Sequence, residues 1–160
     1  MIIESGNTLL PKLVVAIRHK ARKGKSETCR HLANEIFRQY PNTYTVVAGS
    51  VPNSGDFTVV LNVNGKVVVI ISKGDPWSDV AGRLNAAMNY NPDLIYCTCR
   101  TSGETFDDVK VVLPYGFEIV WDSTYWHERG NRPENRAFQT TLNQIKGKHL
   151  LGIAQSLNIL

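Results

Sequence analysis

The sequence predicts an α/β protein whose mixed β-sheet is flanked by helices. Three observations support this class. Short β-branched runs alternate with helical patterns, an Asn64-Gly65 turn joins two of the runs into a hairpin, and a helix with a further strand follows the hairpin. A hairpin makes neighbouring strands antiparallel, whereas a strand–helix–strand connection makes them parallel, so the sheet is expected to be mixed.

The N-terminal part of the chain predicts two helices. The first covers 8–22, because apolar residues recur there at helical spacing, and Gly24 ends it. These apolar residues are Leu9, Leu10, Leu13, Val14 and Ile17. Ser26 is suited to cap the second helix, over 27–40, which Pro41 stops.

The rest of the chain predicts strands and helices in alternation. Three strands come first, and turn residues separate them. They cover 43–48, 56–63 and 66–72. A helix then starts at Asp75-Pro76, with the aspartate as N-cap and the proline as first helical residue, and ends at Asn91-Pro92.

The last 70 or so residues add two strands and two helices to these elements. A buried strand covers 93–99, a short helix follows at 102–110 behind a Thr101–Glu104 capping box, and a strand covers 117–121. The final helix, 136–157, is amphipathic. Its core face is expected to carry Phe138, Leu142, Ile145, His149, Leu150, Ile153 and Leu157, and it is also a candidate surface for a homodimer.

Length and composition indicate one intracellular domain. The 160 residues suffice for a single core, and neither a repeat nor a linker divides them. No apolar run approaches the roughly 20 residues that span a bilayer, and no secretory signal is recognisable. Three cysteines give no disulfide framework. We therefore expect a cytoplasmic protein without a membrane partner.

Positive charge is concentrated near the N-terminus. Residues 1–38 hold eight basic and three acidic side chains, whereas the remainder is nearly balanced. A local cluster of this kind neutralises phosphates, which favours DNA or RNA as partner; the alternative is a solvated helix end. The candidate nucleic-acid-binding residues are Arg18, Lys20, Arg22, Lys23, Lys25 and, after a later strand, Arg100.

An acid and a lysine mark the candidate catalytic site. Asp56 opens the second strand of the hairpin region and Lys73 closes the third, so the two side chains are expected to approach each other across the hairpin. A carboxylate holds Mg²⁺ through oxygen, the metal polarises a phosphodiester, and a neighbouring lysine balances charge in the transition state.

This succession of helix, three strands, helix and strand resembles the PD-(D/E)xK nuclease superfamily over residues 26–100. Gly55-Asp56 and Ser72-Lys73 carry the resemblance. It implies a restriction-endonuclease-like αβββαβ core, here with an extra N-terminal helix in 1–25 and a helix–strand–helix extension in 101–160. It further implies an endonuclease that needs Mg²⁺ or Mn²⁺.

The superfamily's second acid is expected two residues before the lysine, and this position holds Ile71. Asp79, on the following helix, is our preferred replacement and would share the metal with Asp56. Asp75 and Glu35 are the other candidates, Glu35 as an auxiliary catalytic acid. Each also has a structural explanation: Asp75 as helix N-cap, Asp79 as stabiliser of the helix dipole, and Glu35 as partner of Arg38 or Gln39.

Several further groups leave alternatives open. The segment Arg100–Thr105 follows a strand and opens a helix, so it either binds phosphate or forms a capping box. His127 lies in a polar loop, where it is either an acid–base group or a base-stacking side chain. Cys97 and Cys99 are expected to be buried, inert thiols.

The preferred function is therefore a metal-dependent nuclease or a degenerate relative of one. The alternative is a non-catalytic module on the same fold that binds nucleic acid or nucleotide phosphate. A nucleotide-binding accessory protein centred on Arg100–Thr105 and a structural subunit that docks through 136–157 are further hypotheses.

Overall fold

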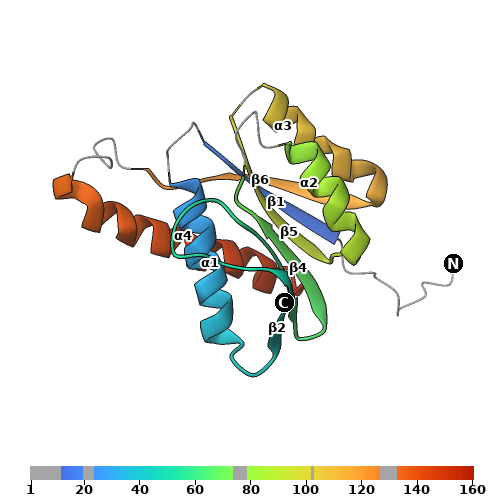
Figure 1. Ribbon diagram of the computed structural model, residues 1–160, viewed down its shortest axis with the longest axis horizontal. Coiled ribbons are helices and arrows are strands. Elements are labelled where there is room, and N and C mark those ends of the chain that lie inside the picture. The colour runs from blue at the N-terminus through green and yellow to red at the C-terminus, as the bar shows by residue number, and fades with distance from the viewer. Residues whose placement is uncertain (1–11, 20–23, 74–78, 102, 127–132) are drawn as a thin grey trace, which may run out of the picture.

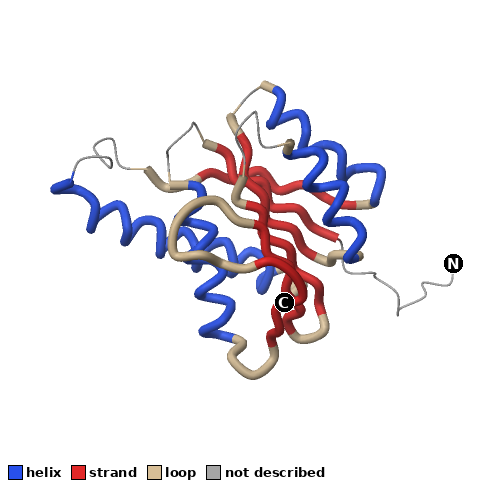
Figure 2. The backbone as a smooth tube through the Cα atoms, in the orientation of Figure 1, coloured by secondary structure: helices blue, strands red, loops and turns tan. Residues whose placement is uncertain are grey.

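The computed structural model describes residues 12–19, 24–73, 79–101, 103–126 and 133–160. Over these residues, six strands form one mixed sheet in the order β2-β3-β4-β5-β1-β6. Figure 2 shows the strands in red and the helices in blue. The strands are β1 Lys12–Arg18, β2 Tyr44–Gly49, β3 Thr58–Val63, β4 Lys66–Ile71, β5 Leu94–Cys99 and β6 Phe117–Ser123. The helices are α1 Lys25–Gln39, α2 Val80–Ala87, α3 Glu104–Asp108 and α4 Arg136–Ser156, with 3₁₀ helices η2 Met88–Tyr90, η3 Val109–Tyr115 and η4 Pro133–Asn135.

The sheet is mixed, as predicted. β2, β3 and β4 form an antiparallel meander, whereas β4, β5, β1 and β6 are mutually parallel neighbours. The turn between β3 and β4 is confirmed, since Asn64 and Gly65 both adopt positive φ, 52° and 81°.

The prediction of a helix over 8–22 is wrong for the part that the structure describes. Residues Lys12–Arg18 form β1, which lies between β5 and β6 in the sheet. Five consecutive side chains from Leu13 to Ile17 are buried, and three of them are β-branched. A strand covered on both faces reads as a continuous apolar run, so its Leu and Val positions also matched a helical spacing. Within the described residues, the expected N-terminal helix is thus an interior parallel strand between β5 and the edge strand β6.

Helices cover both faces of the sheet and divide the core in two. α1 and α4 pack on one face, while α2, α3 and η3 pack on the other (Figure 1). Alternate β1 residues point into the two clusters: Val15 and Ile17 pack beneath α1 and α4, and Val14 and Ala16 beneath α2 and η3. The phenol of Tyr96 on β5 donates to the Leu150 carbonyl of α4 at 2.8 Å, which anchors that helix.

Three helix starts differ from prediction. α1 begins one residue before Ser26, and its N-cap is Gly24 at φ 76°. α2 begins at Val80 behind Asp79, while Asp75-Pro76 lies outside the described residues. The α3 N-cap is Gly103, which has no side chain to cap the helix, and the Thr105 hydroxyl accepts from the Arg100 amide at 2.9 Å. A Thr101–Glu104 capping box is therefore not formed.

The final helix is present at the predicted place, but its buried face is different. Phe138 and Ile145 are 54% and 49% exposed, and His149, expected in the core, is also exposed. The first half of α4 instead buries polar side chains, namely Gln139, Asn143 and Lys146. No helix in the described part of the chain combines the length and the apolar character that crossing a bilayer requires.

Candidate functional site along the carboxyl edge of the sheet

The ends of five strands form one row at an edge of the sheet. β4, β5, β1 and β6 are parallel, so their carboxyl ends share this edge. β3 runs antiparallel to β4, so its amino end lies there too. Four charged residues lie at these ends. In the order of the strands they are Asp56 before β3, Lys73 after β4, Arg100 after β5 and Arg18 at the end of β1. Neighbouring strands lie about 4.8 Å apart, so these four residues span roughly 15 Å.

The row contains a topological switch point. The chain leaves β1 for α1 on one face of the sheet, and it leaves the adjacent β5 for α3 on the other face. Outgoing connections that diverge in this way leave a crevice outside the two strand ends, where α/β proteins bind ligands. Arg18 is the last residue of β1, and Arg100 directly follows β5.

Lys25 joins these arginines from the start of α1. Its ammonium donates to the His19 carbonyl at 3.2 Å and to the Cys99 carbonyl at 3.4 Å, so it caps both strand ends. The His19 amide also donates to the Cys99 carbonyl at 3.2 Å. Lys25 is only 7% exposed, so its charge acts in a partly desolvated environment.

The Arg18 side chain lies on the α2 and α3 side of the sheet. Its guanidinium carbon is 5.5 Å from the centre of the Trp121 ring, which stacks on Phe106 of α3. Its Nε is buried and has no hydrogen-bond partner among the described residues. The pKa of the neighbouring Cys99 thiol is affected by these charges. Burial raises this pKa to about 11, while the positive charges of Lys25 and Arg18 lower it.

Asp56 and Lys73 lie opposite each other where β3 and β4 come to the edge. The Ser72 amide donates to the Phe57 carbonyl at 2.9 Å, and the Phe57 amide donates to the Ser72 hydroxyl at 2.7 Å. These bonds extend the ladder one step beyond the Thr58–Ile71 pair, and Asp56 and Lys73 are the next residues outward. Their charged groups form no ion pair in the described structure.

The Asp56 carboxylate is held by α1. It accepts a short hydrogen bond from the Ser26 hydroxyl. Arg30, one turn further along α1, donates to the Pro52 carbonyl at 2.6 Å and to the Gly55 carbonyl at 2.7 Å. The loop that presents Asp56 is therefore tied to the helix, and Ser26 serves this loop instead of capping α1.

Ile71 occupies the position where a second acid is expected. It is 1% exposed and packs in the apolar cluster beneath α2. A carboxylate at this depth would be desolvated without a charged partner, which is unfavourable. The isoleucine is thus part of the core on this face.

The two other predicted acids do not reach Asp56. Asp79 is the N-cap of α2, with φ 51°, and its carboxylate accepts from the Gly82 amide at 3.1 Å. Glu35 accepts from Arg38 and from the Gln39 amide at 2.7 Å, and the Arg38 hydrogen bond lowers its pKa to about 2. Nine residues of helix separate Glu35 from Ser26, about 13 Å along α1. Both acids are satisfied locally.

Asp56 is the described carboxylate beside Lys73 at this edge. In the described part of the chain, no three His, Cys, Asp or Glu residues converge as a metal site requires. Mg²⁺ is held in proteins by one or two carboxylates together with substrate phosphates, and Asp56 already accepts the Ser26 hydroxyl. Among the described residues, Asp56 is the group that would hold Mg²⁺ or Mn²⁺ beside Lys73, together with oxygens of a phosphodiester.

Some predicted residues lie outside the described structure. They are Lys20, Arg22, Lys23, Asp75 and His127. All three cysteines are described, and they are buried free thiols as expected. Burial raises the pKa of Cys29 to about 12 and also raises that of Cys97 well above its usual value, so these thiols stay protonated.

Sequence reasoning missed the residues that support the site. The sequence suggested Ser26 only as a helix cap and gave Arg30 no role, yet both residues hold the Asp56 loop. Lys146, 2% exposed, donates to Asp122 at the end of β6 at 2.7 Å and lies over the Tyr125 ring. No sequence spacing connects residues 26 and 56 or 122 and 146, so only the tertiary structure reveals these pairs.

Comparisons of this chain with protein-family models, with curated proteins and with solved structures gave no match. What this chain can bind or catalyse must therefore be argued from its own geometry.

Proposed function

We propose that this protein binds the phosphate backbone of nucleic acid along the carboxyl edge of its sheet. The observation that carries the proposal is the position of Arg18, Lys25 and Arg100 at the end of β1, the start of α1 and the end of β5, around the β1–β5 switch point. Arg18 ends β1 and Lys25 starts α1, whereas Arg100 follows β5 and is distant from both in the sequence. Phosphate contacts of this kind supply most of the affinity for nucleic acid and require no base recognition.

The neighbouring segment strengthens the proposal. Lys20, Arg22 and Lys23 lie in the sequence between Arg18 and Lys25, so the same stretch of chain carries five cationic side chains. A cytoplasmic location is part of the proposal, since three buried free thiols suit a reducing compartment.

Binding should be measured by fluorescence anisotropy with labelled single- and double-stranded DNA and RNA over a range of salt concentrations. The logarithm of the association constant is expected to fall linearly with the logarithm of the salt concentration. Arg100→Gln and Arg18→Gln should each weaken binding to all sequences alike and reduce the slope by about one.

Arg38→Gln is the matched control. Arg38 is exposed on the same helix as Lys25 but thirteen residues further on, about 20 Å away. The proposed site would be refuted if the affinity did not change with salt concentration. It would also be refuted if Arg38→Gln and Arg100→Gln lost equal affinity. A mononucleotide that competes as well as an oligonucleotide would restrict the ligand to nucleotide phosphate.

Phosphodiester hydrolysis is a second candidate, favoured by a different observation. Asp56 and Lys73 face each other at the same edge, and α1, β2, β3, β4, α2 and β5 follow the element order of the PD-(D/E)xK superfamily. The test is cleavage of labelled DNA and RNA with Mg²⁺ or Mn²⁺ by wild type and by Lys73→Ala. Cleavage that Lys73→Ala abolishes would support a nuclease; no cleavage by either protein would leave phosphate binding as the function.

A further inference from the structure

A pocket of about 310 Å³ lies between α2 and the β2–β4 meander, away from the switch point. Its floor is apolar, formed by Val60 of β3 and Val69 of β4, which are 3% and 0% exposed. The pocket exists because small residues line both of its walls. They are Ala48 and Gly49 on β2 and Ala86 and Ala87 on α2.

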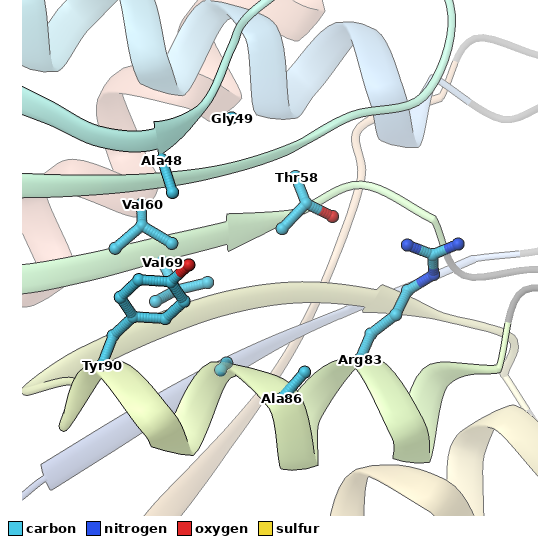
Figure 3. Close-up of a pocket in the computed structure, with 9 residues that line it drawn as sticks. Ala48, Gly49, Thr58, Val60, Val69, Arg83, Ala86 and Tyr90 are labelled. Atoms are coloured by element: carbon cyan, nitrogen blue, oxygen red, sulfur yellow. The ribbon is translucent and has the colours of Figure 1, made fainter.

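The polar groups of the pocket gather at one end. Figure 3 shows the Thr58 hydroxyl and the Arg83 guanidinium at the same end, with the Tyr90 ring at the other. The Thr58 hydroxyl is buried and has no hydrogen-bond partner among the described residues. A buried hydroxyl without a partner is unfavourable, and a ligand that bonds to it would remove this cost.

From this polarity we infer a binding site for a small organic carboxylate with an aromatic body. The carboxylate lies at the Arg83 end, where the guanidinium provides charge and a planar pair of donors and the Thr58 hydroxyl donates a further bond. The ring lies over Val60 and Val69 and against Tyr90. The volume is at the lower end of the range of ligand pockets, which suits one ring with a short substituent. This site is independent of the phosphate site proposed above.

Benzoate and its neutral isostere benzamide are suitable probes. They should be titrated into the isotopically labelled full chain, with the backbone amide shifts of Thr58, Val69 and Arg83 as readout. Benzoate is expected to shift these amides saturably, with a dissociation constant in the millimolar range. Benzamide should bind about tenfold more weakly, because it lacks the charge that Arg83 engages.

Three variants and one control test which residues of the pocket contact the ligand. Arg83→Gln should reduce benzoate binding to the level of benzamide. Thr58→Val keeps the shape of the side chain and removes the hydroxyl, so it should weaken benzoate binding while the protein remains folded. Ala86→Trp, at an exposed position on the rim, should block the pocket, whereas Ala137→Trp on exposed α4 should not.

Retention of the native amide spectrum shows that each variant is folded. The site is refuted if benzoate gives no saturable shifts, if benzamide binds equally well, or if Ala86→Trp binds benzoate like wild type. Displacement of benzoate by an equal concentration of inorganic phosphate would also refute the site, since the site would then recognise negative charge without contacting the aromatic ring.

Discussion

The candidate acidic residues differ in how far along the chain their hydrogen-bond partners lie. Asp79 accepts from Gly82, and Glu35 accepts from Arg38 and Gln39, all within one helical turn. Such spacings are visible in the sequence. They favour the structural explanation of both acids that we weighed against catalysis.

Asp56 is the opposite case, because its partner Ser26 is 30 residues away in the sequence and belongs to α1. Its approach to Lys73 followed from the hairpin register, which the Asn64-Gly65 turn sets. Its bond to Ser26 depends on how α1 packs on the sheet, which no local pattern specifies.

Arg30→Met tests how strongly the Asp56 loop is tied to α1. Methionine keeps an apolar stem of similar length, but it removes the guanidinium that lies over the Phe57 ring and donates to the Pro52 and Gly55 carbonyls. We expect the free energy of unfolding to fall by about 2 kcal/mol, as measured by urea denaturation.

Arg38→Met is the control for this prediction, since Arg38 lies on the same helix and its side chain is 66% exposed. The loss in Arg38→Met should be clearly smaller. Equal losses in the two variants would mean that the loop contacts of Arg30 do not contribute.

At the scale of the element, α4 shows why an apolar stripe did not identify the buried face. The first half of the helix packs against the polar start of α1 and the end of β6. Gln139 donates to the Tyr125 carbonyl and Lys146 to Asp122, so these positions must be polar although they are buried. The hydrophobic pattern predicted the helix and its length but selected Phe138 and Ile145, which are exposed.

The crossing of α1 and α4 depends on Gly147. A Cβ atom there would lie 2.8 Å from the Leu32 amide nitrogen and 2.9 Å from the His31 carbonyl carbon, both backbone atoms of α1. We expect Gly147→Ala to force the helices apart and to lower the free energy of unfolding by about 2 kcal/mol in urea denaturation.

Gly152→Ala provides a control on the same helix, where nothing lies within 4 Å of the added Cβ. It should stabilise the protein by about 0.5–1 kcal/mol, because alanine favours the helix. If both substitutions stabilise, the contact at Gly147 is not limiting.

For the whole molecule, the fold class and most of the element order could be predicted, whereas the place of the N-terminal segment could not. The meander, α2 and β5 followed from turns and alternation. The prediction for β1 was wrong because Leu13–Ile17 is apolar at every position, and periodicity cannot distinguish a strand buried on both faces from a helix. The error concealed the switch point, which exists only because β1 lies next to β5.

The interior position of β1 in the sheet predicts the pattern of amide hydrogen exchange. Amides of β1 and β5 should exchange most slowly, because both strands have paired neighbours on either side and wholly buried interiors. β2 should exchange faster, since it is an edge strand with a register shift between Val46 and Ala48. Exchange followed by mass spectrometry checks this, and equal protection of β2 and β1 would contradict it.

The location of β1 also has a consequence for the order in which the protein is made. A ribosome releases Leu13–Ile17 early, yet both strands that pair with them, β5 and β6, belong to the second half of the chain. The meander can assemble from neighbouring segments while synthesis continues, whereas β1 has to wait as an unpaired apolar strand. Native folding is thus a late event in the life of the nascent chain, completed only once its last strand has emerged.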